Sequence, residues 1–324
     1  MVVSPSSFGC GQIGGNAVTL TVTDPNGLQR SCTATVTVFD TLAPLPVCVN
    51  DTFALNPAGS FALTVPDIAS GSTDNCAISS SNLSQSSFTC ADLGANSVMV
   101  TFSDASGNSS SCSVVVTIVD TTSPNAVCLN DTLYLDGAGA ATLLVSQVND
   151  GSSDACGIDT ISLSVNTLTC AMVGTNSITL SVTDSSGNVG TCNSSILVLD
   201  TIRPQILCNS ATVSLDSSGN YILNGSLLTT GSTDVCSIDT SYAAPFVFDC
   251  QAIGSNVVSV YVEDPSGNID SCTTTITIND NLAPFADCDS IVLQLGGNGI
   301  VALTPLQLGP NSFDNCGIDS SWIS

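Results

Sequence analysis

Apolar and polar residues alternate along much of this chain in short segments. In NSITLSVTD (176–184), the apolar residues Ile178, Leu180 and Val182 take every second position before an acidic turn. The segment after the equivalent turn one period earlier, 112–118, alternates in the same way. A period of two residues predicts half-buried β-strands, here joined into a hairpin. Helical periodicity is almost absent, so we expect an all-β fold.

The same hairpin pattern returns every 80 residues. Its turn segments are TVTDPNGLQR (21–30), TFSDASGNSS (101–110), SVTDSSGNVG (181–190) and YVEDPSGNID (261–270). A fixed period of this length indicates a tandem array of domains. Each period holds several short strands separated by Gly, Ser, Asn and Asp clusters, which predicts immunoglobulin-like antiparallel β-sandwiches.

Boundaries between repeats are expected at four proline-containing linkers, which begin at residues 40, 120, 200 and 280. The expected divisions are the C-terminal half of a repeat at 1–40, complete repeats at 41–120, 121–200 and 201–280, and the N-terminal half of a repeat at 281–324. Two explanations of the half repeats stay open. The chain is a window of a longer repetitive protein, or the halves complete each other between neighbouring chains. In the second case Cys32 pairs with Cys288 of a neighbour, and Cys10 with Cys316.

The 16 cysteines follow the 80-residue period without an insertion or deletion. The chain has no histidine and no CxxC pair, so zinc and redox sites are not indicated. Evenly placed cysteines of this kind are typical of structural disulfides, which form in oxidising compartments outside the cytosol. We therefore expect an extracellular or cell-surface protein whose sandwiches are stapled by disulfides.

Spacing also suggests which cysteines pair within a repeat. The first strand and the second strand of the final hairpin begin at the same pole of a sandwich, which favours Cys48–Cys112. With that bond formed, Cys76 and Cys90 remain to pair with each other. A Cys90–Cys112 bond is less favourable, because a whole strand separates the poles at which these two cysteines lie. Closing the long loop with Cys48–Cys112 stabilises a domain by about 4 kcal/mol, and closing the short loop with Cys76–Cys90 by about 3 kcal/mol. The expected bonds are Cys48–Cys112, Cys76–Cys90, Cys128–Cys192, Cys156–Cys170, Cys208–Cys272 and Cys236–Cys250.

The charge balance excludes several classes of function. The chain has 27 acidic residues against two arginines, with no lysine or histidine, for a net charge of -25. Binding to nucleic acid or to an anionic membrane surface depends on basic residues, so neither is expected. No apolar run approaches the ~18–20 residues of a membrane helix, so we expect no membrane insertion. Without histidine or lysine there is no histidine base and no amine nucleophile, and no unique carboxylate pair suits glycoside hydrolysis. We expect no enzymatic activity.

Three series of aspartates recur with the repeat: one in the hairpin turn (which begins with Asp24), one in the linker, and one just before a cysteine. Two interpretations stay open. The aspartates cap turns through their own backbone, or they bind Ca²⁺ where consecutive repeats meet. In the second, Asp120 groups with Asp154 and Asp184, and such a carboxylate cluster repels itself unless a cation is present. The candidate ligands are Asp40, Asp74, Asp104, Asp120, Asp154, Asp184, Asp200, Asp234, Asp264, Asp280 and Asp314.

Two further features concern the surface. In SYAAPFVF (241–248), Tyr242, Phe246 and Phe248 form either an exposed patch or part of the core. N-glycosylation sequons also occur, although several are expected by chance in a chain rich in Ser, Thr and Asn. The sequon asparagines are Asn50, Asn82, Asn108, Asn130, Asn193 and Asn224.

The frame FTCADLGANSVMVTFSDASGNSSSC, followed by VTIVDTTSP, resembles the hyalin-repeat (HYR-like) immunoglobulin-type modules. These occur in tandem in large secreted and surface proteins, including those of Bacteroidetes-type bacteria. The shared motifs are D-x-x-G-N, D-N-C and D-T-x-x-P; this chain departs from them at Leu28, Ala155 and Val235. The resemblance implies extracellular adhesion or a spacer role without catalysis. It also implies O-glycans, with Thr41, Thr121 and Thr201 as acceptors.

Together these features predict an extracellular structural repeat protein that forms a stalk or filament, with calcium at its junctions. Its partners are copies of itself or further repeats of the same chain, end to end. The alternative is a cell-surface adhesin whose repeats bind glycan or protein ligands directly. Uniform repeat lengths and only 5% aromatic residues favour the structural role.

Overall fold

The computed structural model describes residues 1–323, which divide into two compact units whose regular secondary structure is mostly β-strand. Unit 1 comprises Met1–Cys128, Asn149–Ser164 and Thr179–Asn193. Unit 2 comprises Leu129–Val148, Val165–Ile178 and the residues from Ser194 onward. The predicted limits of the single repeats stay predictions.

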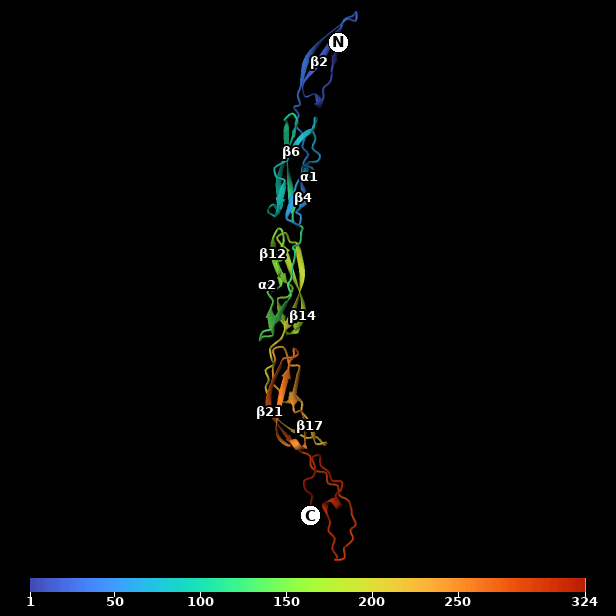
Figure 1. Ribbon diagram of the computed structural model, residues 1–324, viewed down its shortest axis with the longest axis vertical. Helices are drawn as coiled ribbons and strands as arrows, with labels where there is room; N and C mark the ends of the chain where they lie inside the picture. The colour runs from blue at the N-terminus through green and yellow to red at the C-terminus, as the bar shows by residue number, and fades with distance from the viewer. Residues whose placement is uncertain (324) are drawn as a thin grey trace. The chain divides into compact units, whose positions relative to one another are not determined.

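Unit 1 holds the N-terminal half repeat, the whole segment 41–120 and parts of the next repeat (Figure 1). Its short helices lie between strands. Its elements are β1 (Val2–Ser4), η1 (Cys10–Gln12), β2 (Gly14–Thr23), β3 (Gln29–Val38), β4 (Asp51–Ala54), β5 (Ser60–Ala62), α1 (Val65–Ala69), β6 (Ile78–Leu83), β7 (Ser87–Thr89), η2 (Cys90–Asp92), β8 (Gly94–Asp104), β9 (Ser109–Val119) and β12 (Ile158–Leu163).

Unit 2 holds the segment 201–280 and the half repeat after it, together with the rest of the preceding repeat. Two long strands, β14 (Gly174–Asp184) and β15 (Val189–Leu199), have residues in both units. The other elements of unit 2 are β10 (Asp131–Tyr134), β11 (Ala140–Thr142), α2 (Val145–Val148), β13 (Thr167–Thr169), η3 (Cys170–Met172), β16 (Ala211–Ser214), β17 (Asn220–Ile222), η4 (Gly225–Leu227), β18 (Thr240–Ala244), β19 (Val247–Asp249), η5 (Cys250–Ala252), β20 (Gly254–Glu263), β21 (Ile269–Asn279) and α3 (Pro305–Leu308).

Segment 41–120 forms a sandwich of a four-stranded sheet and a two-stranded sheet. The larger sheet has the strand order β4-β9-β8-β6, and the smaller pairs β5 with β7. The predicted hairpin is β8–β9, paired from Gly94↔Ile118 to Ser103↔Ser109. All pairs are antiparallel except β4–β9, which is parallel. The segment 201–280 repeats this arrangement with β16-β21-β20-β18 and β17-β19.

The alternating residues of the hairpin make the core of the sandwich. Val98 and Val100 of β8 are fully buried, as is Val116 of β9. They pack with Phe88 of β7 and Ile68 of α1, which also have almost no exposed surface. Burying side chains of this size stabilises the fold by about 1.5–3 kcal/mol each. The equivalent core in unit 2 contains Phe248, Leu228, Val258, Val260, Ile276 and Ile278. Phe248 therefore fills the core.

The two half repeats lack most of such a core. In the sheet β1-β2-β3, Val36 of β3 is 38% exposed, whereas its counterpart Val116 in β9 is completely buried. Beyond Asp280, the described residues contain α3 and one isolated bridge, between Phe285 and Phe313. Cys32 and Cys288, one in each half repeat, are exposed and unpaired.

Seven disulfides fall into two kinds. The first kind lies within a repeat and matches the predicted bonds Cys48–Cys112, Cys128–Cys192 and Cys208–Cys272, with Cα–Cα distances of 5.9–6.4 Å. The second kind joins consecutive repeats, with Cα–Cα distances of 5.1–5.3 Å. Its members are Cys10–Cys76, Cys90–Cys156, Cys170–Cys236 and Cys250–Cys316.

The predictions Cys76–Cys90, Cys156–Cys170 and Cys236–Cys250 are therefore wrong. The reason is the path of the chain between Cys76 and Cys90. Strand β6 begins next to Cys76, where Ile78 pairs with Asp104 at one pole of the sandwich. Cys90 precedes Gly94, which pairs with Ile118 at the other pole. A proposed Cys10–Cys316 bond between neighbouring chains is also wrong, because both cysteines are bonded within the chain.

Candidate metal sites between repeats

The linker that leaves one repeat is fixed against a loop of the next. Leu45, just after the first linker, forms a two-way backbone bridge with Thr73, with N···O distances of 2.8 and 3.1 Å. This bridge brings Asp40 in the linker close to Asp74, which follows Thr73. The bridge recurs at Asn125–Ser153 and Gln205–Thr233. The same short sequence pattern therefore brings linker and loop aspartates together at each junction.

Three clusters of acidic groups result. In two of them, one carboxylate oxygen from each of three aspartates lies within 4.8 Å of the others. These clusters are Asp40/Asp74/Asp104 in unit 1 and Asp200/Asp234/Asp264 in unit 2. In the remaining cluster Asp120 and Asp154 lie together with the sulfur of Cys156. That sulfur is bonded to Cys90, so it cannot act as a thiolate ligand.

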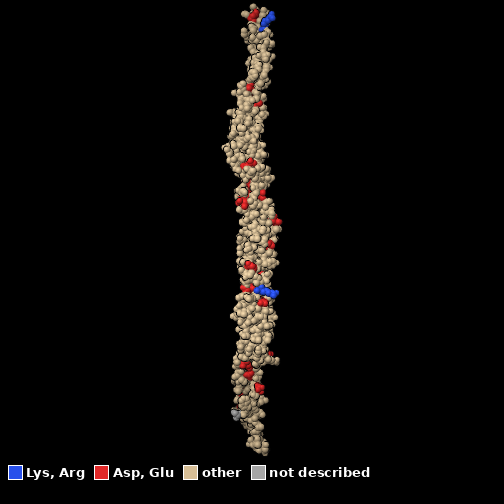
Figure 2. Space-filling model, turned by 90° about the vertical axis from the view of Figure 1, so that its left-hand side faces the viewer, with Lys and Arg blue, Asp and Glu red and all other residues tan. Residues whose placement is uncertain are grey.

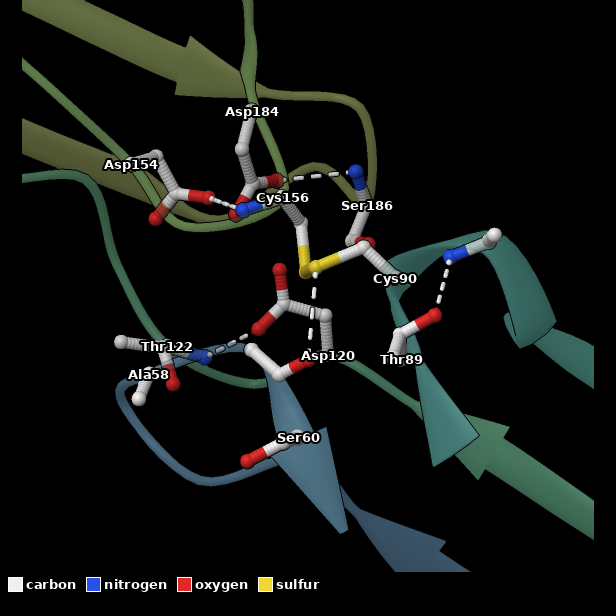
Figure 3. Close-up of a disulfide and its surroundings, with 12 residues drawn as sticks. Ala58, Ser60, Thr89, Cys90, Asp120, Thr122, Asp154, Cys156, Asp184 and Ser186 are labelled. Atoms are coloured by element: carbon white, nitrogen blue, oxygen red, sulfur yellow. Dashed lines mark hydrogen bonds between the residues drawn. A yellow bond between two sulfur atoms is a disulfide. The ribbon is translucent and has the colours of Figure 1, made fainter. Parts of the chain in front are cut away.

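The middle cluster surrounds the inter-repeat disulfide (Figure 3). Asp120 and Asp184 both lie near the Cys90–Cys156 bond, and Asp154 lies on the loop that leads to Cys156. Asp154 Oδ1 accepts a hydrogen bond of 2.8 Å from Cys156 N–H. The predicted grouping of Asp120 with Asp154 is present, whereas Asp184 lies beyond the 4.8 Å grouping.

Several carboxylate oxygens in these clusters are buried and have no hydrogen-bond partner in the described chain. At each junction the unpaired oxygen of the linker aspartate is Oδ2, because Oδ1 accepts a backbone N–H two residues later. Asp120 and Asp200 are only 7% and 5% exposed. Burying a charged oxygen without a partner is strongly unfavourable. The unpaired carboxylate oxygens belong to Asp40, Asp74, Asp120, Asp200 and Asp234.

The turn aspartates have a different environment, because their own turn satisfies them. Asp104 Oδ1 accepts from the backbone N–H groups of Ser106 and Asn108, and the Asn108 side chain donates to Oδ2 at 2.7 Å. The Asn108 amide, aided by the turn backbone, holds the pKa of Asp104 below its usual value against the opposing effect of burial. Asp104 is therefore ionised in the fold at neutral pH.

Asp184 shows the same balance. Burial raises the pKa of Asp184, but hydrogen bonds from Asn188, Ser186 and Gly187 outweigh it, so the pKa is lowered overall. Asn188 also donates to the backbone carbonyl of Asp120 at 3.1 Å. It therefore ties the hairpin turn of one repeat to the linker of the previous repeat. Asn108 and Asn268 make the same contact, to Asp40 and Asp200.

At the fourth linker, the described residues place Asp280 near Asn315, whose amide donates to Asp280 Oδ1 at 3.2 Å. Asp314 Oδ1 accepts from Cys316 N–H. Within residues 1–323 these two aspartates do not join a group of three possible ligands. Asn75 in the first junction donates to Asp40 in the same way, at 3.1 Å. Ala155 and Val235 have no amide to do so.

Acidic residues also lie outside the junctions, for example Asp51 and Asp131. On the face shown in Figure 2, acidic residues appear as small separate groups between broad uncharged areas. Within the described residues, no helix has the length and apolar character needed to cross a membrane.

The junction clusters fit a hard cation. Calcium takes six to eight oxygen ligands from carboxylates, carbonyls and waters, and it tolerates irregular geometry. Zinc in proteins prefers imidazole and thiolate, but the chain has no histidine and the nearby cysteines form disulfides. The linker aspartate and the aspartate before the cysteine would supply the ligands, and their unpaired oxygens are those of Asp40, Asp74, Asp120, Asp200 and Asp234. The spacing of the acidic residues did not predict the role of the asparagines in the turn, Asn108, Asn188 and Asn268.

The chain is similar to two sea urchin proteins. It is 29% identical to hyalin of Strongylocentrotus purpuratus over 264 residues, which cover 76% of this chain and 22% of that protein. It is 26% identical to hyalin of Lytechinus variegatus over 325 residues, which cover 95% of this chain and 61% of that protein. The chain thus spans about a fifth and three fifths of these relatives. The similarity supports a hyalin-repeat family; no protein-family model matches the chain.

Solved structures with several domains in tandem are also similar. The first four cadherin domains of protocadherin gamma B7 give a TM-score of 0.31 at 15% identity, covering 83% of this chain and 84% of that one. Titin fragment I67–I69 gives a TM-score of 0.33 at 12% identity, covering 74% of this chain and all of the fragment.

Proposed function

We propose that this chain is a structural part of an extracellular protein, a stalk or filament of consecutive repeats, and that Ca²⁺ bound at the junctions stiffens it. The repeats follow each other in one chain, and each junction has a linker bridge, an asparagine contact and a disulfide. The partners of a repeat are further repeats of the same kind, in this chain or in copies of it.

One observation carries the calcium part of the proposal. At three junctions a buried carboxylate oxygen of the linker aspartate has no hydrogen-bond partner among the described residues, and at two of them an oxygen of the loop aspartate, Asp74 or Asp234, is unpaired as well. The clusters recur with the 80-residue period, so an unpaired linker carboxylate arises three times. A divalent cation removes the cost by coordinating the unpaired oxygens and neutralising their mutual repulsion.

An extracellular location follows from the cysteine chemistry. Fourteen of the 16 cysteines are in disulfides, which persist in oxidising compartments. Similarity to hyalin supports the same placement. The expected O-glycan acceptors Thr41, Thr121 and Thr201 are all exposed, so a glycan could be attached there without disturbing a core. Intact-mass analysis of the native protein tests the glycan, and a mass equal to that of the sequence excludes it.

Calorimetric titration of the oxidised chain with CaCl₂, after removal of metal with EDTA, tests the calcium sites. We expect binding at three junctions and a higher melting temperature in calcium than in EDTA. The double variant Asp120→Asn/Asp154→Asn should lose one site, since it neutralises the unpaired carboxylate of Asp120 and the neighbouring carboxylate of Asp154.

Asp159→Asn is the matched control. Asp159 lies in the same repeat, in β12, is exposed, and makes no side-chain hydrogen bond among the described residues. It should leave the number of sites unchanged. The calcium proposal would be wrong if the titration gave no heat of binding and the melting temperature were the same in calcium and in EDTA.

A second function is favoured by the surface of segment 201–280. Tyr242 is 43% exposed and stacks on Tyr261 with ring centroids 5.0 Å apart, while Phe246 is 58% exposed. The equivalent of Tyr242 in the preceding repeat is Ser162, and that of Phe246 is Asn166. These differences suit an adhesin that binds a glycan or a protein through this repeat. Binding to a glycan array should fall in Tyr242→Ser/Phe246→Asn, and an array without any bound glycan or an unchanged signal counts against it.

A further inference from the structure

The two kinds of disulfide overlap along the chain. Each bond between repeats spans 66 residues and each bond within a repeat spans 64, so every disulfide loop begins inside the previous one. Cys76 and Cys90 lie in one repeat but belong to different inter-repeat bonds, to Cys10 and to Cys156. A short piece of chain therefore connects two successive inter-repeat disulfides.

That connecting piece is only about fourteen residues long and is already extended. Between Cys76 and Cys90 lie β6, with six residues, and β7, with three. The equivalent piece from Cys156 to Cys170 contains β12 and β13, with the same lengths. The piece from Cys236 to Cys250 contains β18 and β19. Each piece runs from one pole of its repeat to the other.

These pieces and the inter-repeat disulfides form the shortest covalent route through the chain. We define this route as the strap: Cys10–Cys76, residues 76–90, Cys90–Cys156, residues 156–170, Cys170–Cys236, residues 236–250 and Cys250–Cys316. Fourteen residues reach about 50 Å when fully extended. The nine strand residues between Cys76 and Cys90 already take up about 30 Å. The strap can therefore lengthen by at most about 20 Å per repeat.

Without any disulfide, a pulled repeat would lengthen far more, because eighty unfolded residues reach about 270 Å. The within-repeat bonds form a second covalent route, which runs from Cys48–Cys112 along residues 112–128 to Cys128–Cys192. Its roughly sixteen residues per repeat reach about 55 Å, so the strap, with about fourteen, becomes taut first. The long strand β8 and its core residues lie off both routes, so they carry little of a load applied along the strap.

We propose that the strap carries mechanical tension in this protein: force passes from repeat to repeat through covalent bonds, and the sandwiches stay folded. This function goes beyond a spacer, because it makes the chain almost inextensible. It depends on the disulfides and not on bound cations, so the failure of the calcium proposal would leave it standing.

Single-molecule pulling of the full chain, held at its two ends, tests the strap. The oxidised protein should show no unfolding step longer than about 20 Å per repeat, in calcium or in EDTA. The same protein treated with a reductant should show steps of about 230 Å per repeat, which is the unfolded length less the roughly 40 Å of a folded repeat. Long steps in the oxidised protein, or none after full reduction, would overturn the proposal.

A matched pair of variants locates the effect. In Cys90→Ser/Cys156→Ser, the shortest route from Cys76 to Cys170 must pass through Cys48–Cys112 and Cys128–Cys192. That route is longer by about 38 residues, or about 130 Å, so we expect one additional release of this size. Cys48→Ser/Cys112→Ser removes a loop of similar length but leaves the strap intact, and should show no release.

Circular dichroism of both variants checks that they fold. Should either one not fold, the comparison of oxidised with reduced wild-type chain still decides the matter. An equal release from both variants would show that disulfides strengthen the repeats in general and would contradict a strap.

Discussion

The interior of a repeat and the junction between repeats are stabilised by different chemistry. The interior of segment 41–120 is closed by apolar side chains such as Phe88, Val100 and Ile118, none of which titrates or binds an ion. The junction at the end of this segment is held by Asp120, Asn188 and a disulfide. A repeat therefore depends on burial and on its own disulfide, whereas its attachment to the next repeat depends on hydrogen-bonded carboxylates and a second disulfide. The two regions should respond to different perturbations.

The largest effect is expected in the interior. Phe88→Ala removes a fully buried ring from the core and should lower the free energy of unfolding of segment 41–120 by about 3–5 kcal/mol. Amide hydrogen exchange of β8 and β9 measures this locally. The loss should be the same in calcium and in EDTA. Phe246→Ala, at an exposed phenylalanine, is the control and should change stability by less than about 0.5 kcal/mol. A loss of unfolding free energy that differs between calcium and EDTA would contradict this distinction between the core and the junction.

Asn188→Ala breaks the junction without touching a core. The side chain donates to Asp184 Oδ2 and to the carbonyl of Asp120, so both acceptors lose a partner. Loss of a hydrogen bond to a charged group is expected to cost about 1.5–3 kcal/mol. Exchange of the turn and linker amides should accelerate while β14 keeps its protection. Asn193→Ala, in β15, is the control in the same repeat.

The disulfide and the proposed cation site should depend on each other. Cys156 N–H donates to Asp154 Oδ1, so the Cys90–Cys156 bond fixes the loop that carries one candidate ligand. Cys90→Ser/Cys156→Ser should weaken calcium binding at this junction about tenfold, and calcium should slow reduction of the bond by linkage. Titration calorimetry and thiol labelling measure the two effects. Cys128→Ser/Cys192→Ser should change neither, and an equal loss of affinity in that variant would refute the coupling.

The smallest effect concerns Asp92, in the turn after Cys90. A hydrogen bond from Thr89 N–H, helped by Gln85, lowers the pKa of Asp92. Because its pKa is lower in the folded state, Asp92 stabilises the fold above about pH 4, and this contribution disappears as the pH falls through the lowered pKa. Asp92→Asn should thus be less stable than wild type at pH 7, and the difference should be smaller at about pH 3. Thermal unfolding at both values measures it, and a difference that persists undiminished in acid contradicts this account.

The hairpin and the sandwich could be predicted because their signal is local. Every second residue of 98–102 and 114–118 is apolar, and one face of a sheet must be buried. The parallel partner of β4 had no such signal, since a strand of four residues does not reveal which edge it joins. Linker and loop aspartates were recognised from their recurrence. The contact of Asn188 with Asp120 joins residues 68 apart and depends on how two repeats meet.

Disulfide pairing shows the same limit. The bond Cys48–Cys112 follows from strand starts within one sandwich, which the pattern of a single repeat contains. The partner of Cys90 depends on whether residues 76–90 fold back or run straight across. The spacing of the cysteines along the sequence is the same for both paths, so it cannot distinguish them. Once β6 and β7 are extended, Cys90 emerges at the far pole and only a cysteine of the next repeat is within reach.

The overlap of the disulfide loops also affects how the protein withstands proteases. From Cys10 to Cys316, every peptide bond lies inside at least one closed loop, because each loop starts before the previous one ends. A single cut anywhere in that range, even in the linker 120–124, where Thr121 and Ser123 are exposed, leaves the two fragments attached to each other. The protein would migrate as one species on a gel without reductant and as two species with it. Damage to the backbone in the extracellular space can thus accumulate before the chain separates.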